Sequence, residues 1–257
     1  NAGMGKISNI PELSGVAQRM SIPGLEAWLA SAQGRYVIDW ESSRVDTLVA
    51  DIFGFNALQL GLPQIDFLSG NRIPLRQHAG ESGAVDVLCE MTALPFSASS
   101  TDLVVLPHVL EFHHDPHQIL REIERILIPE GHLIILGFNP ISLWGLKNRL
   151  GKGDEFPWNG SYISPLRLKD WLKLLGFELD RNYFGCFAPP FNQQKWLTHW
   201  HFMEAAGDRW WGLPGGVYML HAIKRVPGMR LIAPKWKTAK VGSKALRPVA
   251  QKESNDG

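Results

Sequence analysis

The chain has 257 residues, of which 45% are hydrophobic and 20% charged, so it is long enough for one sizeable α/β domain with additions and is not disordered. Its formal net charge of +1 provides no overall field that would favour nucleic acid or an anionic membrane. No apolar run reaches the roughly 18 residues of a membrane span, and no basic-then-apolar signal opens the chain, so we expect no membrane partner.

The N-terminal region predicts two helices. Residues 1–3 look like an expression scar and are left out of the fold. The segment 23–33 predicts a short amphipathic helix with Gly34 as its C-cap, and the segment 40–53 repeats apolar residues at helical intervals. We expect residues 4–54 to form a helical cap, which either covers a ligand or simply packs on a sheet edge.

The middle of the chain predicts strand, turn, strand, helix, turn and strand. Asp115 and Pro116 supply an N-cap and a first-turn proline, after which apolar residues recur at helical spacing as far as Leu127. Continuous apolar runs of this kind suit strands that are covered on both faces. The three predicted strands are Val85 to Cys89, Leu103 to Leu106, and His132 to Phe138.

Two strands joined by such a helix form a right-handed parallel crossover. The ligand crevice of an open α/β sheet lies beyond the carboxyl ends of its strands. We therefore expect Glu90, residues 107–113 and residues 138–140 to lie at the ligand edge.

The C-terminal half predicts two helices and two more strands. The helices are expected at 142–150 and from Ser164 to Gly176, and the strands at 177–184 and 216–224. Between these two strands we expect a Trp-rich insert at about 187–214, which contains Trp196, Trp200, Trp210 and Trp211. Residues 227–257 are expected to form a basic, solvated tail, or alternatively to contact RNA or an acidic partner.

The segment from Leu94 through Leu143 resembles a known family. It contains LPF, D-x-V, DP, L-x-E, R-x-L-x-P-x-G and NP-x-SL, and in this it is similar to the second half of a class I S-adenosylmethionine-dependent methyltransferase of the type 11 kind. The resemblance implies a Rossmann-like α/β fold over residues 55–226, with a mostly parallel twisted sheet, a final antiparallel strand and helices on both faces. It also implies S-adenosyl-L-methionine as cofactor and a small molecule or a protein side chain as methyl acceptor.

The resemblance assigns cofactor contacts residue by residue. Glu90 takes the position that receives the adenine amino group, Met91 packs on the ring, and Gly61 faces the methionine part; the alternative for Glu90 is a solvated carboxylate at a strand end. The family acid of the first strand is replaced by Gln59, and no carboxylate ends an obvious second strand, so Asp66 or Glu81 would have to hold the ribose. The implied cofactor residues are Gln59, Gly61, Glu90, Met91, Leu106, Pro107 and His108.

Histidines and aromatic residues supply the remaining candidates. His108 and His113 are candidate general bases near neutral pH, although such histidines are also common as structural or exposed residues. The residues expected to line the acceptor site are Phe112, Asn139 and Trp144. We predict no metal site, because adjacent His113 and His114 diverge on most backbones and the helix start explains Asp115.

Two hypotheses of different classes remain. The first is an S-adenosylmethionine-dependent methyltransferase, which the family-like sequence motifs from Glu90 to Pro140 favour. The second is a methyltransferase-like fold that serves as a binding or scaffold module, which the missing glycines and ribose acid favour. Because Cys89 and Cys186 lie far apart without a Cys-x-x-Cys pair, we expect a reducing, cytoplasmic location. The oligomeric state does not follow from the sequence.

Overall fold

The structure is a computed structural model that describes residues 24–151, 153–190 and 215–225. The expected expression scar, the four tryptophans of the insert and the basic tail lie outside the described residues. Among the described residues, no helix combines the length and the apolar composition needed to cross a bilayer.

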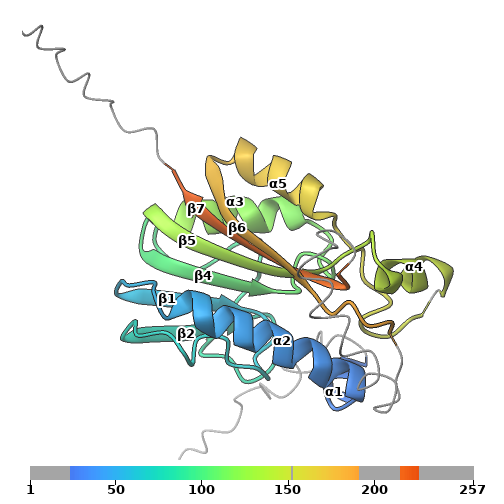
Figure 1. Cartoon of the computed structure of the whole chain (residues 1–257). Helices are drawn as coiled ribbons and strands as arrows, with labels where there is room; N and C mark the ends of the chain where they lie inside the picture. The colour runs from blue at the N-terminus through green and yellow to red at the C-terminus, as the bar shows by residue number, and fades with distance from the viewer. Residues whose placement is uncertain (1–23, 152, 191–214, 226–257) are drawn as a thin grey trace, which may run out of the picture. The chain divides into compact units, whose positions relative to one another are not determined.

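Seven strands of the described residues form one sheet. They span Asn56–Leu60 (β1), Leu75–Gly80 (β2), Val87–Leu88 (β3), Thr101–Pro107 (β4), Leu127–Phe138 (β5), Phe177–Gly185 (β6) and Val217–Lys224 (β7). Their order across the sheet is β3-β2-β1-β4-β5-β7-β6 (Figure 1). β7 runs antiparallel to β5 and β6, and the other pairs are parallel. The predicted mostly parallel sheet with a final antiparallel strand is therefore confirmed.

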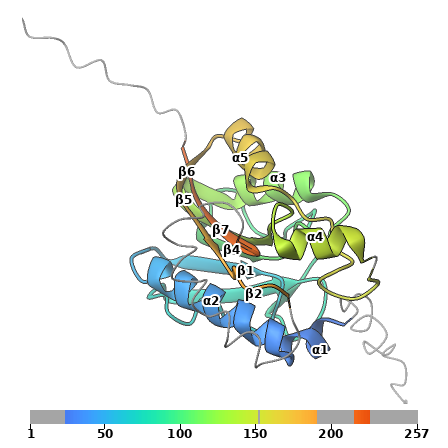
Figure 2. The ribbon, with the colours of Figure 1, turned by 45° about the vertical axis from the view of Figure 1, so that its right-hand side comes forward.

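Helices cover both faces of this sheet, as predicted. They span Leu25–Leu29 (α1), Ala32–Val49 (α2), Pro116–Ile126 (α3), Leu143–Leu150 (α4) and Pro165–Leu174 (α5). Figure 2 shows α2 on one face and α3 with α5 on the other. α1 and α4 lie near the end toward which the parallel strands point (Figure 1).

β4 shows why the sheet needs cover on both sides. Val104 and Leu106 pack in the core with α3, whereas Leu103 and Val105 pack in a second core with α2. Successive side chains of a strand point to opposite faces, so a central strand with two covers reads as a continuous apolar run. All four side chains are fully buried, and each such burial contributes about 1.5–3 kcal/mol.

Some of the residues that carry the family resemblance are joined by hydrogen bonds between α3 and the loop before β4. Arg125 on α3 donates to the carbonyl oxygens of Leu94 and Phe96, both at 2.8 Å. Glu122 accepts from the Leu94 amide at 3.0 Å and is also bound by Arg125. The LPF, L-x-E and R-x-L segments are thus kept together because α3 fastens the loop that precedes β4.

Several expectations from the sequence differ from the structure. The strand expected from His132 to Phe138 is longer, because β5 begins at Leu127 directly after α3 and includes the expected turn. Gly34 does not end a helix: Ser31 is the N-cap of α2, its Oγ accepts from the Gly34 amide at 3.1 Å, and α2 continues without a break to Val49. The strand β2 was not recognised, because its sequence LRQHAG is polar and the strand is half exposed. Such a strand gives no apolar run.

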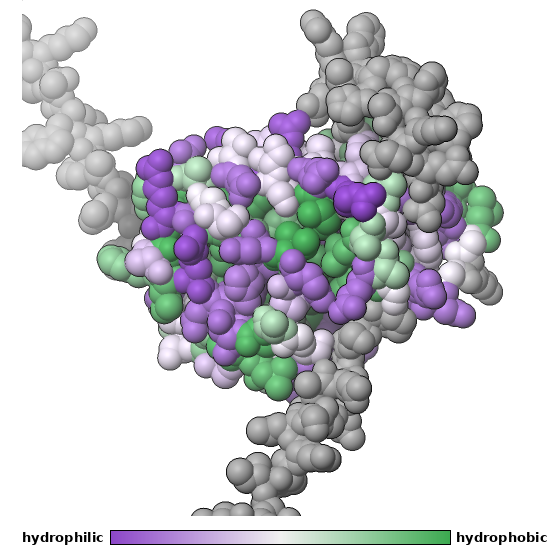
Figure 3. All heavy atoms as spheres, turned by 90° about the horizontal axis from the view of Figure 1, so that it is seen from below, coloured by the Kyte–Doolittle hydropathy of each residue, from purple (hydrophilic) through white to green (hydrophobic). Residues whose placement is uncertain are grey.

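Some large apolar side chains remain on the surface. Phe53 and Phe55, before β1, are 68% and 76% exposed, and Leu75 at the start of β2 is 49% exposed. On the face seen in Figure 3, apolar residues gather in patches that hydrophilic residues surround. Apolar atoms form more than half of the surface of ordinary folded proteins, so these residues need no special explanation.

Candidate active site

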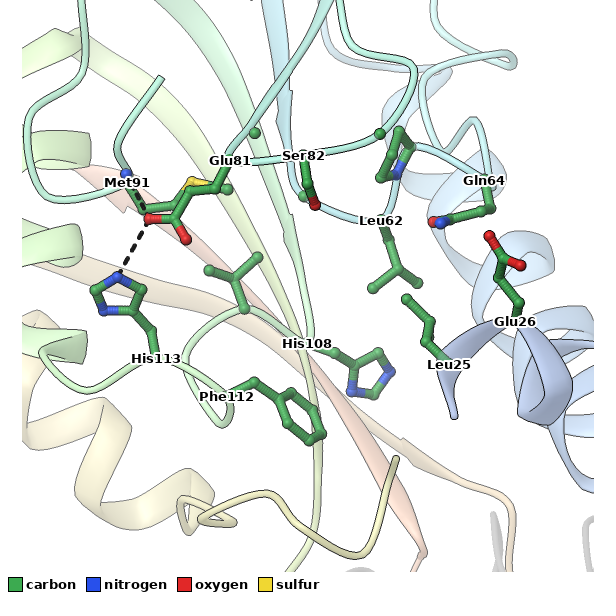
Figure 4. A pocket seen from close by; sticks show the side chains of 15 residues that line it. Leu25, Glu26, Leu62, Gln64, Glu81, Ser82, Met91, His108, Phe112 and His113 are labelled. Carbon is green, nitrogen blue, oxygen red and sulfur yellow. Dashed lines mark hydrogen bonds and ion pairs between the residues drawn. The ribbon is translucent and has the colours of Figure 1, made fainter. Parts of the chain in front are cut away.

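A cavity of about 270 Å³ opens at the carboxyl edge of the parallel strands (Figure 4). Its walls come from α1, from the loops after β1, β2 and β4, and from Met91. The volume is close to the lower end of typical ligand pockets, about 300 Å³. The cavity therefore lies where an open α/β sheet leaves its crevice.

The loop after β1 approaches the loop after β4 very closely. Gly61 has a φ of 81°, and a Cβ atom there would lie 2.6 Å from Cγ2 of Val109. Only glycine fits both the backbone conformation and this contact. Leu62 follows with a φ of 44°, a region that L-residues rarely adopt. Such backbone strain concentrates at functional sites.

The side chain of Gln59 stabilises the loop after β1 through hydrogen bonds to its backbone. Its Nε2 donates to the carbonyl oxygens of Gly61, Leu62 and Ile65 at 3.2, 3.1 and 2.7 Å. Its Oε1 accepts from the amide of Phe67 at 2.9 Å. The side chain is fully buried and does not line the cavity. The structure therefore places Gln59 beneath the expected cofactor loop.

Glu81 stands at the carboxyl end of β2 and faces the cavity. In the parallel register Ala79 lies opposite Leu60, so Glu81 comes next to the Gly61 turn. Oε1 of Glu81 accepts from the amide of Met91 at 3.2 Å and lies 3.4 Å from Nε2 of His113 (Figure 4). Sequence reasoning named Glu81 only as a substitute without context. The signal that could have found it is an acid directly before a Ser-Gly turn.

Glu90 and Met91, which follow β3, lie in different environments. Met91 is 4% exposed and lines the cavity, whereas Glu90 is exposed and lies outside the lining. A carboxylate oxygen of Glu90 accepts from the hydroxyl of its neighbour Thr92. The described cavity thus contains the predicted ring-packing residue but not the predicted partner of the adenine amino group.

His108 is buried between two carboxylates. Its Nε2 lies 2.8 Å from Oε1 of Glu41 on α2, and its Nδ1 lies 3.1 Å from Oε2 of Glu111. Burial, the largest influence, lowers the pKa of His108, but the two carboxylates outweigh it and raise the pKa to about 10. The ring lines the cavity as an imidazolium whose two nitrogens both donate within the protein.

The two residues before His108 do not reach the cavity. Leu106 packs in the core with α3, and Pro107 is buried at the end of β4. His108 itself has a φ of 51°. Leu106 and Pro107 therefore belong to the buried strand, and the cavity lining begins at His108.

His113 also has both ring nitrogens engaged. Its Nδ1 accepts from the amide of Asp115 at 3.1 Å, and its Nε2 faces Glu81. His114 stacks on His113 with ring centroids 4.3 Å apart, while His117 packs 3.8 Å from the Trp171 ring. In the part of the chain that the structure describes, no three His, Cys, Asp or Glu side chains are grouped as metal ligands.

Of the three residues expected at the acceptor site, only Phe112 is among those that line the cavity. Phe112 lines the cavity and packs 4.8 Å from the ring of Phe156. Asn139 and Trp144 are buried outside it: Asn139 donates to the Gly215 carbonyl at 3.0 Å and Trp144 to the Ala188 carbonyl at 2.9 Å. Asn139 thus fastens the end of β5 to the start of β7, and Trp144 fastens α4 to the segment after β6.

The chain shares sequence with known proteins. Residues 64–135 match the model of the family described as "Methyltransferase domain". The chain is 42% identical over 116 residues to "Uncharacterized protein YafS" of Escherichia coli, a match that covers 45% of this chain and 46% of the relative. It is 30% identical over 82 residues to demethylmenaquinone methyltransferase of Chlamydia pneumoniae, covering 32% and 36%. The chain thus spans less than half the length of these curated relatives.

A solved structure shares the fold. The SAM-dependent methyltransferase of Thermotoga maritima superposes with a TM-score of 0.60 at 20% identity, covering 78% of this chain and 95% of that protein. Together with the strand order, this establishes a Rossmann-like architecture. Residues 64–135 therefore resemble the methyltransferase domain of the type 11 family, within a chain whose fold is Rossmann-like.

Proposed function

We propose that the cavity binds S-adenosyl-L-methionine and that the chain transfers its methyl group to a small molecule or a protein side chain. The observation that carries this proposal is the carboxylate of Glu81 at the end of β2, beside the Gly61 turn at the end of β1. An acid at the end of the second strand is the group that holds ribose hydroxyls in Rossmann-like folds.

The residues present fit the group. Glu81 supplies acceptors for the two ribose hydroxyls, and the thioether of Met91 offers a polarisable surface for the adenine ring. The missing Cβ at Gly61 lets the ligand approach the backbone of the β1 loop. Glu26 of α1 lines the same cavity and provides a negative charge that suits the amino group of the methionine part.

S-adenosylmethionine supplies an electrophilic methyl group on a sulfonium sulfur. The protein's task is then to position the two reactants and to keep water out. Leu25, Leu62 and Phe112 form apolar walls around the cavity. We place the acceptor beside Phe112, an aromatic lining residue on the loop after β4.

A binding or scaffold module remains the second candidate. Leu62 and Pro63 stand where further glycines would be expected in a cofactor loop. This replacement favours a chain that has kept the fold without the affinity.

A thermal-shift series separates the two candidates. S-adenosylhomocysteine, NAD and methionine are titrated separately against the full chain, because a ligand that binds the native state must raise its melting temperature. The proposal expects a saturable rise with S-adenosylhomocysteine and none with NAD. A flat response to S-adenosylhomocysteine at millimolar concentration would favour the scaffold module.

A further inference from the structure

We infer that His113 is a positioning residue, which holds the Glu81 carboxylate in the orientation that reads the ribose hydroxyls. This inference rests on the proposed function and names a residue that acts through Glu81. The two residues come from different strand ends, Glu81 after β2 and His113 after β4.

The tautomer of His113 is set by its backbone neighbour. Nδ1 accepts from the Asp115 amide at 3.1 Å, so the proton of the neutral ring is on Nε2. Nε2 lies 3.4 Å from Oε1 of Glu81 and points toward it in Figure 4. Nε2 therefore faces the Glu81 carboxylate at 3.4 Å, a contact longer than an ordinary hydrogen bond, and presents no competing acceptor to it.

The ring is also held rigidly. The side chain of His113 is 7% exposed, and His114 stacks on it. Asp115, which orients Nδ1, is itself the N-cap of α3, where its Oδ1 accepts from the Gln118 amide at 3.0 Å. The position of the imidazole is thus fixed by the start of a buried helix.

Glu81 needs such a partner because its strand does not confine it. The Glu81 side chain is 22% exposed and follows the half-exposed β2. His113 and the Met91 amide both contact Oε1, which fixes one oxygen and directs the carboxylate as a whole. Fixing one oxygen lowers the rotamer entropy that Glu81 would lose when it binds a diol.

The test compares two ligands on four proteins by calorimetry. The ligands are S-adenosylhomocysteine and its 2′-deoxyribose analogue, and the proteins are wild type, His113→Phe, His113→Gln and His114→Phe. His113→Phe keeps a ring but removes the donor, and His113→Gln keeps an N–H donor. His114→Phe keeps an aromatic ring beside His113 at an exposed position that does not line the cavity.

We expect His113→Phe to weaken binding of S-adenosylhomocysteine by up to about tenfold, because the 3.4 Å contact with Glu81 is longer than an ordinary hydrogen bond. The deoxy analogue should lose less than about threefold, because part of the contact that His113 organises is already missing. His113→Gln should restore part of the loss, and His114→Phe should match wild type.

Equal losses for both ligands in His113→Phe would reduce His113 to a structural tie between two loops and overturn the inference. An unchanged dissociation constant in a folded His113→Phe would do the same. If His113→Phe does not fold, His113→Gln and Glu81→Gln carry the same comparison, and a ribose preference that survives Glu81→Gln contradicts the inference. Wild type that binds neither ligand would refute the proposed function instead.

Discussion

Nε2 of His108 lies 2.8 Å from Oε1 of Glu41, and this contact joins the carboxyl end of β4 to the middle of α2. The side chains of Glu41, His108 and Glu111 are all nearly inaccessible. Removing one member of a buried ionic group leaves another charge without compensation, which costs about 3–5 kcal/mol. We expect His108→Gln to lower the free energy of unfolding by an amount on this order.

The same cluster predicts an alkaline loss of stability. The pKa of His108 rises from 6.5 to about 10 in the fold. A raised pKa stabilises the fold fully below the unfolded value, and this stabilisation fades as the pH rises through the folded value. Urea unfolding should therefore show stability falling from about pH 6.5 toward about pH 10. The fall should be shallower in His108→Gln, and an equal slope in both proteins would contradict the assignment.

A second histidine pair predicts an acid loss. Nδ1 of His132 lies 2.9 Å from Nε2 of His221, whose Nδ1 faces Asp180 at 3.0 Å. Burial lowers the pKa of both histidines, and for His221 the charge of His132 adds to the effect. A lowered pKa means that stability is present above about pH 6.5 and is lost as the pH falls.

His132→Gln should make that acid loss shallower. The measurement is the free energy of unfolding in urea at pH 7.5 and pH 5, with the exposed His117→Gln as the matched control. If the control flattens the acid response as much as His132→Gln does, the stacked pair is not its source.

Gln59→Glu tests the support of the β1 loop. The new carboxylate would face three carbonyl oxygens that now receive hydrogen bonds from Nε2. We expect a loss of about 3 kcal/mol in stability, because a buried charge would replace a satisfied amide. The exposed Gln64→Glu, in the same loop, should change stability by less than about 0.5 kcal/mol. A Gln59→Glu protein as stable as wild type would show that the loop tolerates the family's acid.

Two tyrosines with buried hydroxyls predict different responses to removal of the hydroxyl. Among the residues that the structure describes, none forms a hydrogen bond with the buried Tyr162 hydroxyl, whereas the Tyr218 hydroxyl donates to the Ile163 carbonyl at 3.0 Å. Burial raises the pKa of both phenols, so both remain protonated. Tyr218→Phe should cost about 1 kcal/mol, and Tyr162→Phe should be neutral or stabilising by thermal unfolding. A larger loss in Tyr162→Phe would indicate a partner for its hydroxyl.

The parts of the fold that sequence reasoning predicted are those with strong local signals. α3 was predicted because Asp115 and Pro116 mark its start and its apolar face repeats regularly, and β4 because both of its faces are buried. α2 was divided wrongly at Gly34, because the capping by Ser31 is a hydrogen bond that letters alone do not show.

The candidate site was harder to predict, because most of it depends on neighbours distant in sequence. The position of Glu81 depends on a half-exposed strand and on its contact with His113, 32 residues later in the chain. The engagement of His108 by Glu41 spans 67 positions. Local periodicity carries no information about such contacts.

The most direct test of the account is calorimetric titration of wild type, Glu81→Ala and Glu90→Ala with S-adenosylhomocysteine. The structure places Glu81 in the cavity wall and Glu90 outside it. The account predicts saturable binding by wild type, a loss of about 1–3 kcal/mol for Glu81→Ala, and a smaller change for Glu90→Ala. Absence of binding by wild type at millimolar ligand, or a larger loss for Glu90→Ala than for Glu81→Ala, would contradict it.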